Sequence, residues 1–323
     1  MDLIYYPDDR PGITRRRCGK GFSFFDCDGA RITDPAERAR LKALAVPPAY
    51  EQVWMSPHPN GHLLATGRDA RRRKQYRYHP DWTAARAATK FDRLAGFAQS
   101  LPALRRWIAD RLKGEVGERD TALAAALALI DRGALRAGTP EYAAENQSYG
   151  ATTLLSDHVR VDGSSIRLDY TAKGGREVTR RLRGERLAEV LEESADLPGA
   201  ELLTWLDEAE APHRVRTEAL NTVLEAVCGN GVTAKTLRTW HGTHAAFLSA
   251  LEARPATIKR MSEAAAERLQ NTPAIARSSY IHPRVIALSE KSEDELDARL
   301  ETLGPAPDGL RRGEAELAAF LGG

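Results

Sequence analysis

The sequence is poor in the residues that build metal sites and disulfide frameworks. It contains three cysteines, Cys18, Cys27 and Cys228, and no CxxC pair. This spacing indicates neither a structural zinc site nor a disulfide scaffold, and it favours a protein of a reducing cytoplasm. The HExxH signature of zinc hydrolases and the GxxxxGK[ST] phosphate loop are absent too. We therefore expect no metal and no nucleotide cofactor.

Long apolar segments are also missing. The sequence has no run of 18 apolar residues and no hydrophobic segment of the signal-peptide type near residue 1. We therefore expect neither membrane insertion nor secretion. Apolar residues make up 42% of the chain and charged residues 28%, as in ordinary globular proteins. A length of 323 residues is sufficient for two domains that each bury a core.

The net charge of +2 is unevenly distributed along the chain. Residues 1–90 have a charge balance of +7, whereas the remainder has a balance of −5. The most basic run is residues 67–79, GRDARRRKQYRYH, in which Lys and Arg are interleaved with Gln, Tyr and His. Cations at this density neutralise phosphates, while Gln and Tyr can contact bases, so the run predicts a nucleic-acid contact. The candidate residues are Arg68, Lys74, Gln75, Tyr76, Arg77 and Tyr78.

Strand and helix patterns divide the chain into two predicted domains. Residues 1–85 read as a small β-rich domain, in which Pro59-Asn60-Gly61 predicts a hairpin. Residues 86–323 read as a larger, mainly helical domain, so the predicted fold class is α+β. The expected helices in this second part are 91–112, 118–135, 185–194, 201–207, 215–229, 234–252, 256–270, 273–280 and 292–303.

One β-hairpin interrupts the helical part. Residues 165–170 and 177–182 have strand character, and the segment between them contains Lys173 followed by Gly174 and Gly175. Two glycines allow the backbone to turn tightly. The pattern therefore predicts that Lys173 lies at the tip of the hairpin.

A second short segment, residues 271–283, has strong helix boundaries. Thr272 is a good N-cap, Pro273 suits the first helical position, and Pro283 cannot continue a helix. The result is a two-turn helix that carries Tyr280 near its end. The preceding Ala-Arg-Ser-Ser run is mostly small, which suits a phenol that a bulky substrate must approach. Taken alone, a tyrosine in this place is more often a core or surface residue.

Together these segments resemble the type IB DNA topoisomerases, in particular the poxvirus-like enzymes of bacteria. The resemblance covers most of the chain, and its motifs occur in the order of the family: GRDARRRKQYRYH (67–79), LRAGTPEYAAENQSYGATTL (135–154), DYTAKGG (169–175), KTLRTWHGTHAAF (235–247) and NTPAIARSSYIHP (271–283). It implies a catalytic set of Arg136, Lys173, Arg238, Asn271 and Tyr280.

The resemblance implies a reaction that relaxes supercoiled duplex DNA. Tyr280 attacks a phosphodiester and forms a 3′-phosphotyrosyl intermediate, one strand rotates, and the 5′-hydroxyl reseals the nick. Arg136 and Arg238 stabilise the non-bridging oxygens, and Lys173 protonates the departing 5′-oxygen. The ester conserves the bond energy, so neither ATP nor metal is expected. The expected protein is a monomer that clamps duplex DNA in the nucleoid.

Two alternatives remain open at the level of sequence. Tyrosine recombinases share this chemistry, but they usually carry a histidine three residues before the second arginine, where this chain has Lys235. A catalytically silent DNA-binding module is the other alternative, although the whole Tyr/Arg/Lys set is present. Viral topoisomerases carry a histidine nine residues before the tyrosine, where this chain has Asn271. Asn can donate a hydrogen bond but cannot titrate.

Overall fold

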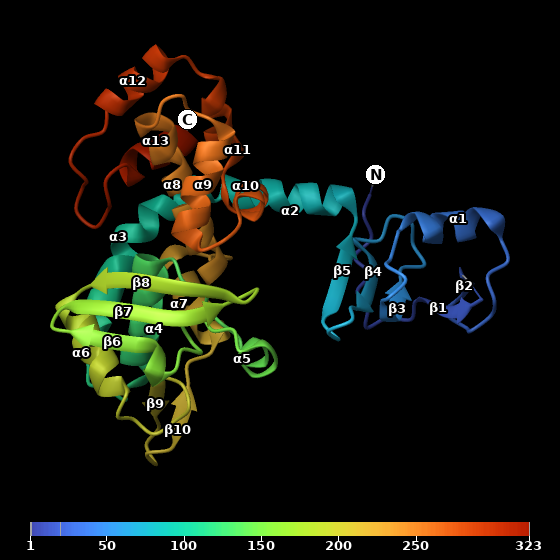
Figure 1. The fold of residues 1–323 in the computed structure, drawn as a ribbon, viewed down its shortest axis with the longest axis horizontal. Helices are drawn as coiled ribbons and strands as arrows, with labels where there is room; N and C mark the ends of the chain where they lie inside the picture. The colour runs from blue at the N-terminus through green and yellow to red at the C-terminus, as the bar shows by residue number, and fades with distance from the viewer. Residues whose placement is uncertain (1, 20, 323) are drawn as a thin grey trace. The chain divides into compact units, whose positions relative to one another are not determined.

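The computed structural model describes residues 2–19 and 21–322, except for the side chains of residues 87–90. The chain divides into two compact units, Met1–Phe91 and Asp92–Gly323 (Figure 1). The N-terminal unit is built on an antiparallel sheet, and the C-terminal unit is mainly helical with a β-hairpin. The predicted α+β fold class is therefore confirmed.

A five-stranded antiparallel sheet forms the frame of the N-terminal unit. The strands follow the order β2-β1-β3-β4-β5. Their bounds are β1 (Ile13–Cys18), β2 (Gly21–Phe25), β3 (Glu51–Met55), β4 (Leu63–Arg68) and β5 (Lys74–Tyr78). Strands β3 and β4 pair antiparallel on either side of the Pro59-Asn60-Gly61 loop, so the hairpin predicted from that tripeptide is confirmed.

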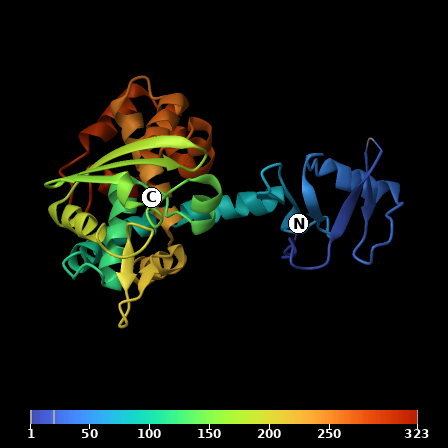
Figure 2. The same ribbon diagram turned by 60° about the horizontal axis from the view of Figure 1, so that its bottom comes forward.

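The core of this unit lies between the sheet and helix α1 (Pro35–Ala43) (Figure 2). Met55 in β3 lies opposite Ile13 in β1 and Ala65 in β4, and all three are buried with Leu41 of α1. Helix α1 starts at Pro35 because the side chain of Asp34 accepts hydrogen bonds from the first free backbone N–H groups.

The helices after the sheet start with α2 (Pro80–Asp92) and α3 (Leu94–Arg111). The segment that directly follows the sheet is thus helical. The remaining helices are α4 (Arg119–Gly133), α5 (Pro140–Asn146), α6 (Glu185–Ser194), α7 (Thr217–Cys228), α8 (Ala234–Glu252), α9 (Ile258–Leu269), α10 (Pro273–Tyr280), α11 (Pro283–Ile286), α12 (Glu293–Glu301) and α13 (Glu314–Gly322), with short 3₁₀ turns at Ser156–His158 and Ala287–Glu290. Within the described part of the chain, no helix is long and apolar enough to cross a lipid bilayer.

The predicted helix at 201–207 is wrong. These residues contain β9 (Thr204–Leu206), which pairs antiparallel with β10 (Pro212–Arg214). The two strands are joined by a tight turn in which the Asp207 carboxylate accepts hydrogen bonds from the N–H groups of Ala209 and Ala211. Asp is a strong turn residue for this reason, and the turn chemistry decides against a helix.

Helix α4 lies at the centre of the C-terminal unit and packs against α3, α6, α7 and α8. The spacing of Leu123 to Ile130 predicts one buried face, but the structure buries every side chain from Thr121 to Asp131. A helix that is apolar on all sides is enclosed on all sides. Its C-terminal end therefore lies inside the protein, where its last carbonyl groups need partners.

A three-stranded antiparallel sheet, β6-β7-β8, covers part of this helical core (Figure 1). Its strands are β6 (Val159–Asp162), β7 (Ser165–Ala172) and β8 (Arg176–Arg183). The predicted hairpin is confirmed, since Ala172 pairs with Arg176 around the tip that carries Lys173. Both glycines of the tip have positive φ, 90° at Gly174 and 72° at Gly175, a backbone conformation that favours glycine.

Candidate active site

Arg238 lies at the meeting point of three helices. It is in the first half of α8 and only 4% of its surface is exposed. One terminal nitrogen donates to the carbonyl of Ala134 at the end of α4, and the other donates to the carbonyl of Leu269 at the end of α9, at 3.0 Å. Carbonyl groups at helix C-termini are unsatisfied and carry partial negative charge, so they hold a buried guanidinium well.

The electrostatic environment of Arg238 follows from this burial. Burial lowers the pKa of Arg238 to about 10, the charge of Arg136 acts in the same direction, and the phenol of Tyr280 opposes the shift. The guanidinium is therefore still charged at neutral pH. Its Nε is buried and has no hydrogen-bond partner among the described residues. Arg238 thus has one buried donor whose hydrogen-bonding capacity the described residues leave unused.

Tyr280 is the last residue of α10 and is half-buried. The helix begins as predicted, with Pro273 in its first turn and the Thr272 hydroxyl accepting a hydrogen bond from the N–H of Ile275. Pro283, which was predicted to end this helix, is also the first residue of the next helix, α11. The ring centroid of Tyr280 lies 5.5 Å from Cζ of Arg238, so the phenol and the buried guanidinium are direct neighbours.

The sequence interpretation missed two residues of α8 that contact Tyr280. A Cβ atom added to Gly242 would lie 2.9 Å from both the Cβ and the carbonyl oxygen of Tyr280, so only glycine fits. The hydroxyl of the next residue, Thr243, donates to the carbonyl of Tyr280 at 3.0 Å. The sequence gives only a weak indication of this contact, namely a glycine and a threonine at 242–243 inside a segment that otherwise favours a helix.

Arg136 follows the C-terminal end of α4 by only a few residues. Ala134, which caps the C-terminal end of α4, has a left-handed backbone, and the chain then runs beside Ala151 and Thr152. The Arg136 carbonyl accepts from the N–H of Ala151 at 2.8 Å, and the Ala137 carbonyl accepts from the N–H of Thr152 at 2.7 Å. These backbone bonds fix the segment on which Arg136 lies, two residues beyond the carbonyl that Arg238 contacts.

Asn271 lies just beyond α9 and is buried. Its backbone N–H donates to the carbonyl of Ala266, and its side-chain oxygen accepts from the N–H of Thr272 at 3.0 Å. Because the oxygen is used in this way, the amide NH₂ is the part of the side chain suited to donate to a ligand. Asn271 is two residues beyond Leu269, the other carbonyl that Arg238 contacts.

Lys173 is exposed at the tip of the β7–β8 hairpin, as predicted. Its ammonium nitrogen lies 4.4 Å from the ring centroid of Tyr142 in α5, a cation–π contact. Lys173, Tyr142 and Arg136 line one pocket of about 210 Å³ together with Tyr149. Arg238 therefore lies beside Tyr280 and bonds to the backbone two residues before Arg136 and two residues before Asn271. Arg136 and Lys173 line the same pocket.

Two further tyrosines of the C-terminal unit, Tyr149 and Tyr170, are alternative candidates for the nucleophile. Tyr170 is 6% exposed, and burial raises the pKa of its phenol, which disfavours the phenolate. Tyr149 packs against the ring of His158, with centroids 4.4 Å apart. Tyr149 is also partly exposed and Tyr170 also feels the charge of Arg238. Tyr280 combines partial exposure with a ring contact to the Arg238 guanidinium.

In the N-terminal unit, strand β5 divides the predicted DNA contacts between two faces. Tyr76 and Tyr78 are exposed on one face and their rings stack, with centroids 6.0 Å apart and an interplanar angle of 8°. Lys74 lies on the same face, 5.4 Å from the Tyr76 ring, and forms an ion pair with Asp8 at 2.6 Å. This face presents aromatic and cationic groups together.

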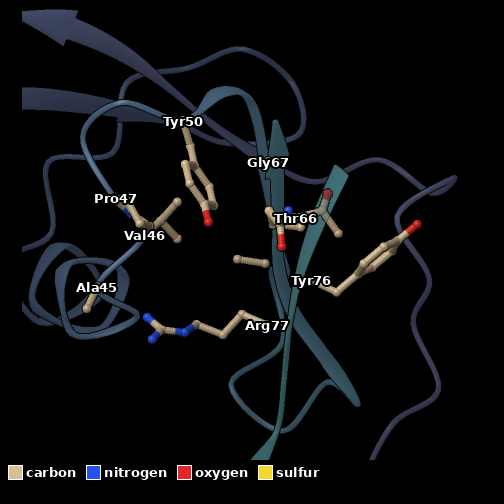
Figure 3. Close-up of a pocket in the computed structure, with 10 residues that line it drawn as sticks. Ala45, Val46, Pro47, Tyr50, Thr66, Gly67, Tyr76 and Arg77 are labelled. Carbon is tan, nitrogen blue, oxygen red and sulfur yellow. The ribbon is translucent and has the colours of Figure 1, made fainter. Parts of the chain in front are cut away.

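Gln75 and Arg77 point to the opposite face of β5, in keeping with strand alternation. Figure 3 shows Arg77 extending towards Ala45 while Tyr76 lies on the other side of the strand. Arg77 donates to the carbonyl of Leu44, and Gln75 donates to the Asp69 carboxylate at 3.0 Å. Both line a pocket of about 200 Å³.

Arg68, the remaining candidate for DNA contact, is exposed in β4. It donates to the side chain of Gln52 at 2.9 Å and to the carbonyl of Arg72 at 2.8 Å. Over the residues that the structure describes, no group of three or more His, Cys, Asp or Glu side chains is arranged to hold a metal ion.

Comparison with known proteins gives matches over most of the chain. The family model described as the bacterial DNA topoisomerase IB N-terminal domain matches residues 21–69, and the model described as the eukaryotic DNA topoisomerase I catalytic core matches residues 79–294. The chain is also similar to DNA topoisomerase 1B of Acanthamoeba polyphaga mimivirus. The two are 26% identical over 317 residues, which cover 90% of this chain and 94% of that protein.

Proposed function

The chain belongs to the type IB DNA topoisomerase family, and we propose on this basis that it relaxes supercoiled duplex DNA through a covalent phosphotyrosyl intermediate at Tyr280, without ATP or metal. The observation that supports the assignment of Tyr280 most strongly is its position beside the buried guanidinium of Arg238. A phenol next to a fixed cation is the pairing that attack on a phosphodiester needs.

In the proposed reaction, Tyr280 Oη bonds to phosphorus and the bond between phosphorus and the 5′-oxygen breaks. The phenolic proton leaves to solvent or to a nearby base, and the 5′-oxygen takes a proton from an acid. The DNA 3′-end stays attached to Tyr280 while the free strand rotates. Religation is the reverse step. Each step exchanges one phosphoester bond for another, so no external energy source is required.

Charge on the two non-bridging oxygens is greatest in the transition state, and Arg238 and Arg136 are proposed to bind them. Arg238 is held at two helix ends by the hydrogen bonds of its terminal nitrogens, and its Nε has no partner among the described residues. A donor fixed in advance in a buried site costs little reorganisation during the reaction. The NH₂ group of Asn271 is proposed as a neutral donor to the same oxygens.

Lys173 is proposed as the general acid that protonates the departing 5′-oxygen. Its ammonium is exposed, lies in the pocket shared with Arg136 and rests on the ring of Tyr142. A cation–π contact at an exposed site is worth only about 0.5–1 kcal/mol, so bound DNA can displace it. The side chain is therefore free to reach the leaving oxygen when the substrate is in place.

DNA binding is proposed to involve both units, with the exposed face of β5 as one contact surface and the protein acting as a monomer in the nucleoid. The aromatic and cationic side chains of that face, Lys74, Tyr76 and Tyr78, suit phosphates and bases. The two units are proposed to close on duplex DNA from different sides.

The proposal is tested by plasmid relaxation in EDTA without nucleotide. The purified protein is expected to relax both positively and negatively supercoiled plasmid, and Tyr280→Phe is the matched control because it removes only the phenolic oxygen. Tyr280→Phe should bind duplex DNA with nearly unchanged affinity but form no covalent adduct. Strict dependence on ATP or Mg²⁺, or an adduct in Tyr280→Phe, would contradict the proposal.

A further inference from the structure

The C-terminal end of α10 is completed by a side chain of another helix. The last carbonyls of a helix lack partners within it, and the N–H groups that follow have left the helical pattern. Here the carbonyl of Tyr280 accepts a hydrogen bond from the Thr243 hydroxyl at 3.0 Å, and the same hydroxyl accepts from the N–H of His282 at 3.2 Å. Thr243 is completely buried, so one hydroxyl satisfies the backbone on both sides of Ile281.

The adjacent Gly242 determines how closely α10 approaches α8. The space that a Cβ would need is already occupied by the Cβ and carbonyl oxygen of Tyr280, each 2.9 Å away, and by a methyl group of Leu269 at 2.8 Å. These distances are shorter than real Cβ contacts, so Tyr280 rests directly on the α8 backbone. Gly242 is one helical turn after Arg238 and thus on the same face, which brings the phenol beside the guanidinium.

We propose that Gly242 and Thr243 are positioning residues for the nucleophile. Gly242 sets the depth at which Tyr280 lies against α8, and Thr243 fixes the direction of its backbone. Only two rotatable bonds separate a tyrosine Cα from its phenol, so fixing the backbone restricts where the oxygen can point. The inference rests on the proposed role of Tyr280 and adds to it the residues that align the attack.

A purely structural role for Thr243 makes a different prediction. A buried hydroxyl with two satisfied partners contributes to stability in any protein, and its loss would lower the melting temperature without changing the rate of the folded enzyme. A positioning role changes that rate, because a displacement of about 1 Å at a reacting group can cost about 10²-fold. The rate of cleavage per folded molecule therefore separates the two roles.

The experiment compares Thr243→Val, Thr243→Ser and Gly242→Ala in single-turnover cleavage of a duplex at saturating enzyme, with DNA affinity and melting temperature measured on each. Thr243→Val keeps the shape and removes the hydroxyl, and Thr243→Ser keeps the hydroxyl. The matched control is Thr239→Val, since Thr239 is also completely buried in α8 but its hydroxyl donates to the carbonyl of Lys235 within the same helix.

We expect Thr243→Val and Gly242→Ala to cleave about 10²-fold more slowly with unchanged DNA affinity, while Thr243→Ser and Thr239→Val stay near the wild-type rate. A wild-type rate in folded Thr243→Val, or an equal loss in Thr239→Val, overturns the inference. Should Thr243→Val fail to fold, Gly242→Ala decides: slow cleavage supports the inference, and a wild-type rate overturns it.

Because Tyr280→Phe is measured in parallel, a wild-type rate in Thr243→Val with no adduct in Tyr280→Phe rejects the positioning role alone. An adduct in Tyr280→Phe rejects the proposed nucleophile as well.

Discussion

Arg238 and Lys173 carry the same charge in opposite settings. Arg238 is buried and held by carbonyls at the ends of two helices, whereas Lys173 is exposed at a hairpin tip and rests on a tyrosine ring. Arginine suits the first setting because its guanidinium has several donors in a fixed plane and stays protonated. Lysine suits the second because its flexible ammonium can reach an acceptor and exchange its proton, as the proposed general acid must.

The role of Lys173 can be separated from simple charge stabilisation. Loss of a fixed charge-stabilising donor costs roughly 10²–10³ in rate, and loss of a general acid costs roughly 10²–10⁴, so the defect of Lys173→Ala alone does not decide. A substrate with sulfur in place of the bridging 5′-oxygen does decide. Its leaving group is a thiolate, whose conjugate acid has a pKa of about 8.5 by analogy with cysteine, and it departs without an acid.

We expect the sulfur substrate to restore cleavage by Lys173→Ala towards the wild-type rate, measured in single-turnover assays. Arg136→Ala and Arg238→Ala serve as controls and should recover much less, because their proposed task is to bind the non-bridging oxygens. Equal rescue of all three variants, or of none, would show that Lys173 is not the specific proton donor.

At the scale of elements, α8 organises the candidate active site. The helix carries Arg238, Gly242 and Thr243, and it is bonded to the C-terminal helix α13. Trp240 donates to the buried carboxylate of Glu314 at 3.0 Å, and Arg105 of α3 forms an ion pair with the same carboxylate at 2.6 Å. A buried charged group is stable only when it is paired and hydrogen-bonded, and this pairing holds α3, α8 and α13 together.

Strand β5 gives a prediction about its two faces. The double variant Tyr76→Ala, Tyr78→Ala should bind duplex DNA about tenfold or more weakly and lose site preference, because a contact to a base edge or base face is worth about 1–3 kcal/mol. Arg77→Gln should have a smaller effect, since that guanidinium already contacts the carbonyl of Leu44 on the other face. Binding isotherms at several salt concentrations measure both.

Thermal melts are needed alongside these isotherms, because the contact of Arg77 also holds the loop after α1. If folded Arg77→Gln weakens binding as much as the tyrosine variant does, both faces of β5 contact DNA. Unchanged DNA affinity in all of these variants would show that β5 is a solvent-exposed strand that does not contact DNA.

At the scale of the whole molecule, burial of histidines makes stability depend on pH. Burial lowers the pKa of His62, His158, His241, His244 and His282. The pKa of His241 is lowered well below its ordinary value, so burial keeps this histidine neutral. The charged groups around it are Asp131, Arg105, Arg268 and Arg311. A histidine with a lower pKa in the folded state binds more protons when unfolded, so stability is lost as pH falls below about 6.5.

We therefore expect the free energy of unfolding to fall as the pH is lowered from 7.5 through 6.5 to 5.5. Each histidine that is neutral when folded and protonated when unfolded contributes a slope of about 1.4 kcal/mol per pH unit. Urea titrations at the three pH values measure the slope, and His241→Gln, compared with its own value at pH 7.5, should make it shallower. A constant free energy across this range would show that these histidines titrate normally in the folded protein.

The sequence by itself determined the local parts of this protein. The helix that carries Tyr280 and the hairpin tip that carries Lys173 follow from residues next to them, namely Thr272-Pro273 and the paired glycines. Caps and turns are set by interactions within a few residues, so they can be predicted locally. The same rule failed at residues 204–206, where pairing with a strand across a turn outweighed a weak helical pattern.

Only the tertiary structure decided how these parts meet. Arg238 contacts Ala134, which is 104 residues away, and Leu269, which is 31 residues away. The fit of Tyr280 onto Gly242, the bond from Thr243 to the end of α10 and the division of β5 into two faces also depend on packing. No local pattern encodes such contacts, because they form only when the buried faces of distant segments exclude water together.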